Sequence, residues 1–348
     1  MLKQESLLAQ AGLCKDEKTG AISTPIYQTS TFRHPALGKS TGFDYSRTIN
    51  PTRKVLEELI ARLESGDRGF AFSSGMAAIT TIANLFRSGD HIIVSDDLYG
   101  GTYRLFEAVY SRFGIRTTYV DSSDIKKIEQ AINPATKAMF IETPTNPLMK
   151  ITDIRKTAEI AKKHHLLTIV DNTFMTPFYQ RPIELGVDIV VHSGTKYLSG
   201  HNDVLCGFVV TATEELSQKI GFLQNATGGV LSPSDSWLVI RGLKTLAIRM
   251  ERSEQNALKI AKWLLAQKSV SAVYFPGIES HHGHDLHRSQ SSGFGSMISF
   301  RIGNAQEAEK IINSVNLISF AESLGGVESL ITYPCVQTHG DIPAEMTG

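Results

Sequence analysis

The chain has 348 residues, of which 41% are hydrophobic and 20% are charged, so it can bury a sizeable core and is long enough for two domains. Its 35 Lys and Arg residues balance 35 Asp and Glu residues, and a net charge of zero provides no overall field to recruit nucleic acid or an anionic membrane. Three widely spaced cysteines and the lack of a long apolar run after Met1 argue against a disulfide framework and a signal peptide. We therefore expect a cytoplasmic protein whose partners are small molecules or copies of itself.

The first fifty residues are rich in Thr, Ser, Pro and Gly and carry few apolar side chains. Such a segment cannot bury a core of its own, so we predict that residues 1–50 form an arm lying against another surface. After it, Asn50 and Pro51 match an N-cap followed by proline at the first helical position. Apolar residues from Val55 to Leu63 continue that helix.

Strand and helix signals alternate from Gly69 onwards. Short apolar runs predict strands at 69–72, 91–94, 137–142, 166–170 and 187–191. Between two of them, Thr152 and Asp153 can cap a helix whose cationic end, Lys162 and Lys163, suits the helix dipole. Repeated strand and helix units with short polar joints predict a doubly wound, mostly parallel sheet, which we assign to residues 51–232.

The pattern changes at Ser232 and Pro233. One long helical pattern then runs from Trp237 to Leu264. Further strands are predicted at 270–274, 297–300 and 317–320, with a helix at 305–315. We interpret residues 233–348 as a smaller C-terminal α/β domain.

Polar clusters fall at the ends of several predicted strands: Ser73 to Gly75, Asn146, Asp171, and Ser193 to Lys196. Each cluster alone is compatible with ordinary turn chemistry, because Ser, Asn, Asp and Gly favour turns for local reasons. Parallel strands, however, bring their carboxyl ends to one edge of a sheet, where open α/β sheets hold their ligands. The common location therefore predicts a ligand site with a lysine beside it.

A turn into a helix at Ser74, Gly75 and Met76 offers backbone N–H groups and the positive end of a helix dipole, which suits a phosphate group. A plain serine N-cap is the alternative. The chain has neither a Walker lysine motif nor a G-x-G-x-x-G motif, which removes the main support for a nucleotide-binding protein.

Lys196 and Asp171 together suggest a cofactor that needs both an amine and a carboxylate. A lysine at the ligand edge can form a Schiff base with an aldehyde when its pKa is lowered. Pyridoxal phosphate also needs an acidic partner that keeps its ring nitrogen protonated. A solvated surface lysine is the alternative for Lys196.

Five segments then resemble the Cys/Met-metabolism family of pyridoxal-phosphate enzymes, the trans-sulfuration group of cystathionine γ-synthases, γ-lyases and β-lyases. They are Ser73 to Ala78, Tyr99 to Thr102, Glu142 to Pro147, Val170 to Thr173, and His192 to Leu198. The resemblance runs in the same order from about Thr24 to the end. It implies the PLP-dependent transferase fold type I, with a large sheet domain and a smaller C-terminal domain.

The resemblance also implies site residues. Lys196 would hold the cofactor as a Schiff base and carry protons with help from Tyr99, which would stack on the ring. Asp171 would pair with the ring nitrogen and Asn146 would approach the 3-hydroxyl oxygen. The phosphate would be held by Gly75, Met76, Ser193 and Thr195 and, from a neighbouring subunit of a homotetramer, by Tyr45 and Arg47.

Substrate contacts would come from Arg104, Glu322 and Ser323. The segment from Glu322 to Ser329 resembles γ-synthases and γ-lyases, and Gly101 stands where methionine γ-lyases carry cysteine. A salt-bridged surface arginine and an ordinary edge carboxylate are the alternatives for Arg104 and Glu322. The expected function is to make or break the C–S bond of cystathionine-like amino acids, by γ-synthase or γ-lyase chemistry first and β-lyase chemistry as the alternative.

Three further features complete the expectations. The histidines from His281 to His287 could ligate zinc, but no second ligand set accompanies them, so we expect no metal. Cys206 reads as a buried strand residue. The family has a later arginine that clamps the substrate α-carboxylate, whereas the last arginine here is Arg301. We therefore expect a truncated C-terminal domain with cofactor binding but impaired turnover, or else a non-catalytic role.

Overall fold

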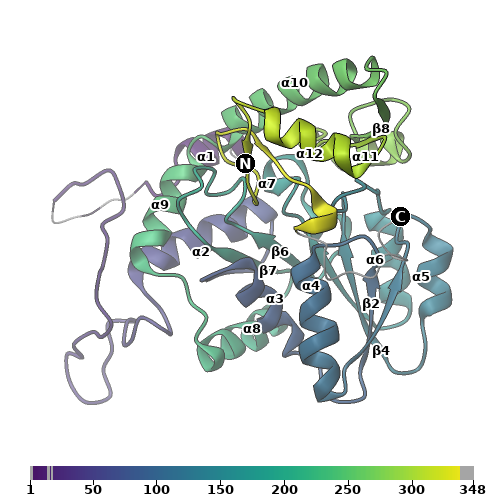
Figure 1. Ribbon diagram of the computed structural model, residues 1–348. Coiled ribbons are helices and arrows are strands. Elements are labelled where there is room, and N and C mark those ends of the chain that lie inside the picture. Colours follow the sequence, from purple (N-terminus) through teal and green to yellow (C-terminus); the bar gives the residue numbers. More distant parts are fainter. Residues whose placement is uncertain (1–2, 14–15, 17–18, 338–348) are drawn as a thin grey trace.

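The computed structural model describes residues 3–13, 16 and 19–337. Over these residues the chain is built around one seven-stranded sheet with helices on both faces (Figure 1). Neighbouring strands in the sheet follow the order β1 (Arg68–Phe72), β7 (Gly207–Thr211), β6 (Ile189–Ser193), β5 (Leu167–Asp171), β4 (Thr136–Glu142), β2 (His91–Ser95) and β3 (Arg116–Val120). β7 is antiparallel to both of its neighbours and the other pairs are parallel, which confirms a mostly parallel sheet.

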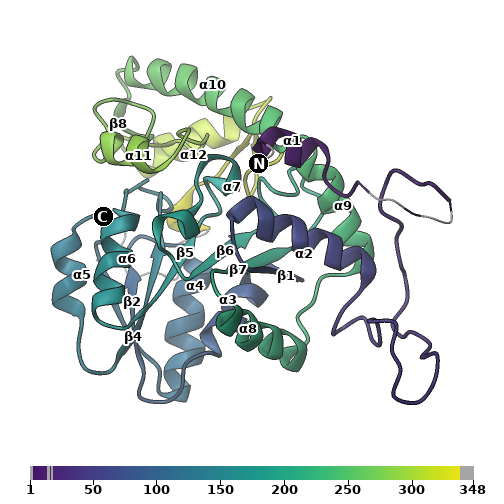
Figure 2. The same ribbon diagram turned by 180° about the vertical axis from the view of Figure 1, so that it is seen from behind.

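The core lies in two layers, one on each face of the sheet. On one face pack the apolar sides of α2 (Pro51–Glu64), α6 (Ile154–Lys163) and α9 (Pro233–Leu243). On the other pack α3 (Gly75–Ala83) and α8 (Glu214–Thr227). Figure 2 shows the first of these faces. Because helices cover both faces of the sheet, the strand sequences are continuous apolar runs and do not alternate between apolar and polar residues.

Two predicted helix starts are confirmed by their caps. The Asn50 side chain accepts hydrogen bonds from the backbone N–H groups of Thr52 and Arg53 at the start of α2, with Pro51 in the first turn. The Asp153 side chain caps α6, which ends at Lys163 as the charge pattern predicted.

The long helix predicted from Trp237 to Leu264 is wrong in one respect, because the chain breaks at Lys244 and Thr245 into α9 and α10 (Leu246–Leu265). The carbonyl of Gly242 accepts hydrogen bonds from the Arg249 guanidinium (2.9 Å) and the Thr245 hydroxyl (3.1 Å). Arg249 also donates to the Tyr197 carbonyl at 2.7 Å, and burial lowers its pKa to about 10. The break between α9 and α10 is therefore stabilised by the side chains of Thr245 and Arg249, the second of which also contacts the distant Tyr197.

The C-terminal part contains α10, α11 (His284–Gln290), α12 (Ala305–Ser314) and two small sheets. β8 (Val270–Tyr274) pairs antiparallel with β9 (Ser299–Ile302), and β10 (Ser319–Phe320) pairs parallel with β11 (Leu330–Ile331). The strand predicted at 297–300 begins two residues late, and only the last two residues of 317–320 are extended in a sheet. The boundary at 232–233 stays a prediction, and the predicted truncation concerns an end of the chain outside the described residues.

The remaining elements are short or connect the larger ones. They are α1 (Gln4–Ala9), α4 (Gly100–Arg104), η1 (Leu105–Val109), η2 (Tyr110–Phe113), α5 (Ile125–Ala131), α7 (Thr176–Tyr179), η3 (Pro182–Leu185) and η4 (Pro334–Val336). Among the described residues, no helix has the length and apolar character needed to cross a bilayer.

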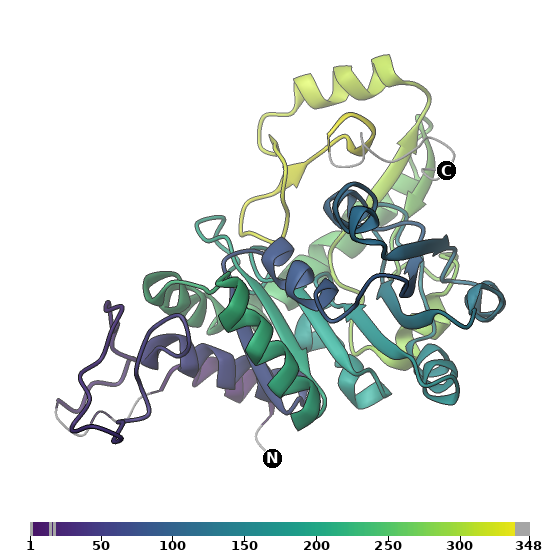
Figure 3. The ribbon, with the colours of Figure 1, turned by 90° about the horizontal axis from the view of Figure 1, so that it is seen from below.

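The bounds of the predicted arm, residues 1–50, stay a prediction. Leu8 and Ala11, in and just after α1, are buried in the core and Thr24 is buried as well, whereas most of the residues from 25 to 49 are exposed on a segment that extends from the body (Figure 3). Its root is fixed by Arg53, a buried side chain of α2, which donates to the carbonyls of Ser46 (2.6 Å) and Thr48 (3.2 Å).

Replacing Asn50 tests how strongly the arm root and α2 depend on this cap. Asn50→Ala removes the cap and two donated hydrogen bonds, to the Tyr27 carbonyl and the Ser46 hydroxyl. We expect the free energy of unfolding in urea to fall by about 1–2 kcal/mol. Asn50→Asp keeps the capping oxygen and should recover part of the loss; an Asn50→Ala protein as stable as the parent would contradict the assignment.

Candidate active site

Six of the seven strands of the central sheet have their carboxyl ends at one edge of that sheet. β2 to β6 run parallel, and β1 runs the same way because β7, antiparallel to both, separates it from β6. The polar side chains after these strands therefore share that edge, as the sequence predicted. They include Ser74 after β1, Glu142 at the end of β4, Asp171 at the end of β5 and Lys196 after β6.

Lys196 lies under the segment that carries Glu322 and Ser323. Its ammonium group donates a 2.9 Å hydrogen bond to the Ser323 hydroxyl. Burial lowers the pKa of Lys196, and the negative charge of Glu322 opposes this shift. A Cβ on Gly325 would lie 2.6 Å from the Tyr197 nitrogen, so this segment packs directly on the backbone beside Lys196. The structure thus brings three predicted site residues together.

Asp171 is buried and held by its neighbour two positions along. Its Oδ1 accepts hydrogen bonds from the Thr173 hydroxyl (2.5 Å) and the Thr173 backbone N–H (3.0 Å). Burial raises the pKa of Asp171, while these bonds and the charge of His192 lower it. The Thr173 hydroxyl also accepts the backbone N–H of Ser193 at 2.8 Å. The Thr173 hydroxyl therefore joins the Asp171 carboxyl group to Ser193. There begins the lysine loop, the turn after β6 that carries Lys196.

Glu142 stands beside Asp171 in the register of β4 and β5. Its carboxyl group accepts the backbone N–H of Tyr99 at 3.0 Å and the backbone N–H of Asn146. Burial and the charge of Asp171 raise the pKa of Glu142 well above its usual value. Because two adjacent buried carboxyls resist ionising together, Glu142 and Asp171 titrate as a coupled pair, and the pKa of each is raised.

Gly75 begins α3 in close contact with Ser193. A Cβ on Gly75 would lie 3.1 Å from the Cα and Cβ atoms of Ser193, and one on Gly207 would lie 2.2 Å from the Ser74 carbonyl oxygen. The Ser74 side chain caps α3 by accepting from Ala77. The first N–H groups of a helix lack intrahelical acceptors, so this corner presents donors to an anion beside the Ser193 hydroxyl.

The ring of Tyr99 lies between Gly101 and the solvent. A Cβ on Gly101 would lie 2.4 Å from the Tyr99 ring and 3.1 Å from the sulfur of Met76. Tyr99 is 41% exposed, which leaves part of its surface available for another planar group. Arg104 follows at the end of α4 and is exposed.

Thr195 forms hydrogen bonds with the backbone of Cys206. Its backbone N–H and its hydroxyl donate to the Cys206 carbonyl at 3.1 and 3.2 Å, and the hydroxyl accepts the Cys206 N–H at 3.0 Å. A phosphate contact from Thr195 stays a prediction. Burial raises the pKa of Cys206, which sits just before β7 as a core residue.

Tyr45 and Arg47 lie on the arm and do not join Lys196 within this chain. The Arg47 guanidinium lies 5.7 Å from the centroid of the Tyr45 ring and donates to the Asn225 carbonyl on α8. Figures 1 and 3 show the segment that carries them extending from the body, and the contact of Arg47 reaches back to α8. Their role toward a neighbouring subunit stays a prediction.

A family model described as "Cys/Met metabolism PLP-dependent enzyme" matches residues 5–347. The chain belongs to this family. A cystathionine gamma-lyase of Bacillus subtilis strain 168 is 55% identical over 344 residues, covering 99% of this chain and 91% of that protein. A cystathionine beta-lyase of Lactococcus lactis strain MG1363 is 51% identical over 346 residues, covering 99% and 91%. The structure of a cystathionine gamma synthase from Xanthomonas oryzae, in complex with aminoacrylate and cysteine, is similar at a TM-score of 0.97 with 40% identity, covering 99% and 90%.

These matches confirm four expectations: the family, the α/β fold of its members, dependence on pyridoxal phosphate and enzymatic activity. The residues at the sheet edge fit that cofactor. A partly buried amine at Lys196, a buried carboxyl group at Asp171 and a helix start packed against Ser193 would suit its aldehyde, ring nitrogen and phosphate. When bound, pyridoxal phosphate supplies a ring that accepts electrons from the substrate carbon next to the amino group.

Sequence reasoning missed two groups that hold the site together. Thr173 lies two residues after an aspartate, a spacing typical of a local side-chain turn, but nothing in the sequence links it to Ser193. Glu64 and His192 form a fully buried pair at 2.6 Å behind the lysine loop, and Asn172 also donates to Glu64 at 2.9 Å. No local signal identifies such a pair.

The predicted histidine cluster does not converge. His281, His284 and His287 contact three different backbone carbonyls, of Met149, Pro276 and Gly293. In the described part of the chain, no group of three His, Cys, Asp or Glu side chains is arranged to hold a metal ion.

The link through Thr173 predicts a shift in pH dependence. Thr173→Val removes a hydrogen bond that lowers the pKa of Asp171, so the pKa of this carboxyl rises. We expect the acidic limb of the kcat/KM profile to move to higher pH, and the affinity for pyridoxal phosphate to fall about tenfold. Thr173→Ser keeps the hydroxyl and should behave like the parent; an unchanged acidic limb in Thr173→Val would refute the link.

The close packing of the Tyr99 ring against Gly101 predicts how one added methyl group would affect the enzyme. In Gly101→Ala the new Cβ collides with the ring of Tyr99, which is free to move, so the protein folds but the ring is displaced. We expect an altered absorbance of the bound cofactor and a lower kcat with little loss of thermal stability. Tyr99→Phe, which keeps the ring in place, serves as the comparison; normal turnover by Gly101→Ala would contradict the assigned packing.

Proposed function

We propose that this enzyme of sulfur amino-acid metabolism makes or breaks the C–S bond of cystathionine-like substrates at the γ carbon, as a γ-lyase or a γ-synthase. The contact between the Lys196 amine and the Ser323 hydroxyl carries this proposal. It places the segment that resembles γ-type enzymes over the residue expected to act as the base, with the charge of Glu322 near the same amine.

Chemistry at the γ carbon needs one base that removes a proton first from Cα and then from Cβ. Lys196 suits this role because burial lowers the pKa of its amine, which makes the neutral, proton-accepting form more accessible. The Ser323 hydroxyl orients the amine from one side. Tyr99, whose ring lies near the start of α3, would assist proton transfer.

The remaining roles are those that the family resemblance implies. Asp171 would hold the ring nitrogen, and Asn146 would lie by the 3-hydroxyl oxygen. Gly75, Met76, Ser193 and Thr195 would hold the phosphate, joined by Tyr45 and Arg47 of a neighbouring subunit. Arg104 and Glu322 would contact the substrate. A homotetramer and a cytoplasmic location belong to this proposal and rest on the family resemblance.

β-Lyase chemistry is the second candidate. The beta-lyase of Lactococcus lactis is almost as similar to this chain as the gamma-lyase of Bacillus subtilis. Overall similarity therefore does not distinguish cleavage at the β carbon from cleavage at the γ carbon. The reaction products do distinguish them.

A product assay with purified protein and pyridoxal phosphate tests the proposal. From cystathionine and water, γ-elimination gives ketobutyrate, cysteine and ammonia, whereas β-elimination gives pyruvate, homocysteine and ammonia. A γ-synthase joins cysteine to an activated homoserine and releases its acid. We expect ketobutyrate or newly formed cystathionine; pyruvate as the main product would overturn the γ assignment.

The same assay tests Lys196. In Lys196→Ala we expect the cofactor absorbance that borohydride removes to be absent and turnover to be lost, because no amine remains to bind the aldehyde or move protons. Lys126→Ala, at an exposed lysine far from the site in sequence, is the matched control and should keep both. Normal turnover by Lys196→Ala would exclude the assigned base.

A further inference from the structure

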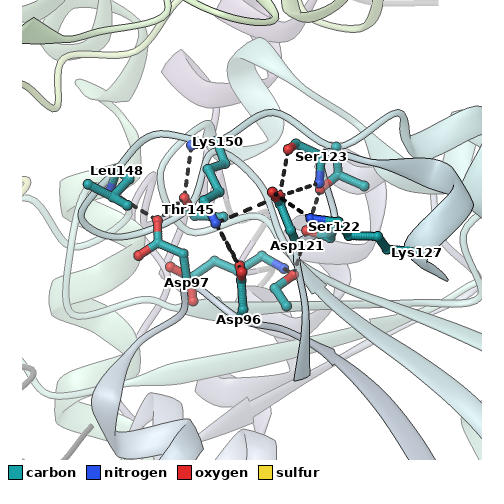
Figure 4. A network of polar contacts seen from close by, with 12 residues as sticks. Asp96, Asp97, Asp121, Ser122, Ser123, Lys127, Thr145, Leu148 and Lys150 are labelled. Atoms are coloured by element: carbon teal, nitrogen blue, oxygen red, sulfur yellow. Dashed lines mark hydrogen bonds and ion pairs between the residues drawn. The ribbon is translucent and has the colours of Figure 1, made fainter. Parts of the chain in front are cut away.

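The loop from Thr143 to Thr152 follows β4 and carries Asn146. Side chains from the ends of two other strands hold it, as Figure 4 shows: Asp96 and Asp97 after β2, and Asp121 and Ser122 after β3. The hydroxyl of Ser122 contacts those of Ser95 (2.9 Å) and Thr152 (2.7 Å). The far end of the loop is thereby tied to the sheet.

Lys150 is the cation at the centre of this network. Its ammonium group donates to both carboxylate oxygens of Asp96, at 2.9 and 3.0 Å, and lies 3.7 Å from Asp121. Burial lowers the pKa of Lys150, but Asp96, Asp121 and Asp97 together raise it above its usual value. Lys150 therefore stays charged and pairs with two carboxylates, Asp96 and Asp121, that otherwise repel each other, while the charge of Asp97 acts on it without a direct contact.

Asp97 fixes the other side of the loop. Its Oδ2 accepts the hydroxyl of Thr145 and the backbone N–H of Leu148, the latter at 3.0 Å. The Thr145 hydroxyl accepts the backbone N–H of Lys150 at 2.8 Å, and the backbone N–H of Thr145 donates to the carbonyl of Lys150 at 3.1 Å. Asn146 thus lies in a short turn whose two ends are bound to each other and to Asp97.

The network joins two residues assigned to the cofactor. Asp97 precedes Tyr99 by two positions, and the backbone N–H groups of Tyr99 and Asn146 both donate to Glu142. Any movement of the loop relative to β2 changes the position of Asn146 against the Tyr99 ring.

We infer that Lys150 is a positioning residue, which through its pairing with Asp96 and Asp121 holds the turn that presents Asn146 to the cofactor beside Tyr99. This inference rests on the proposed roles of Asn146 and Tyr99. Nothing in it requires γ-carbon chemistry, since the turn would position Asn146 in the same way for either elimination.

The chain offers a matched control. Lys127 also pairs with Asp121, at 3.6 Å, but it is more exposed than Lys150 and none of its described ion pairs involves the loop. Lys150→Met and Lys127→Met remove the same charge from the same acidic cluster, and only the first removes the cation that the loop itself carries. Lys150→Arg keeps the charge and should restore most of the parent behaviour.

Two measurements on the cofactor-loaded protein test the inference. Hydrogen exchange should quicken at the amides of residues 145–150 in Lys150→Met and not in Lys127→Met. Absorbance titration should show the protonation of the bound cofactor shifted in the direction seen for Asn146→Ala, with an affinity for pyridoxal phosphate about tenfold weaker. Because Lys150 acts through Asn146, adding Lys150→Met to Asn146→Ala should change the titration little further.

The inference is overturned if exchange in the loop is unchanged, if Lys127→Met has the same effects, or if the two substitutions are additive. These outcomes are separate from those for the proposed function, because hydrogen exchange and cofactor absorbance are read without turnover. A protein that gives pyruvate rather than ketobutyrate loses the γ assignment and still reports on Lys150.

Discussion

The chemistry of the site depends on two carboxyl groups that the parallel register of β4 and β5 places side by side. Glu142 and Asp171 are both removed from water, so ionising both is costly and the pKa of each carboxyl is raised. Thr173 and the charge of His192 favour the anion at Asp171. Glu142 accepts the backbone N–H groups of Tyr99 and Asn146, so one member of the pair positions these two residues while the other, Asp171, is the carboxyl expected to serve the cofactor.

Close backbone approach is the second constraint. The turn after β1 rests on β7, where a Cβ at Gly207 would meet the Ser74 carbonyl oxygen at 2.2 Å, and α3 starts against Ser193. The corner offered to a phosphate exists because strands distant in sequence meet there with small residues at the contact. β7 lies antiparallel between β1 and β6, so β1 and β6 run in the same direction. The turn after β1 and the lysine loop after β6 therefore lie at the same edge of the sheet.

Features set by neighbouring residues could be predicted from the sequence, and those set by distant contacts could not. The caps of Asn50 and Asp153 are local, and the meeting of Lys196, Asp171 and Ser74 at one edge follows from strand direction. The break at Lys244 and Thr245 was missed because it depends on Arg249 taking the Gly242 carbonyl. The link from Thr173 to Ser193 and the pair of Glu64 with His192 were missed for the same reason.

Arg249 connects the joint between α9 and α10 to the backbone beside Lys196. Its guanidinium binds the Gly242 carbonyl at the end of α9 and the Tyr197 carbonyl next to Lys196, while its own backbone belongs to α10. The joint between the two helices is therefore tied to the backbone one residue from Lys196. The angle between α9 and α10 and the position of the lysine backbone thus depend on one side chain.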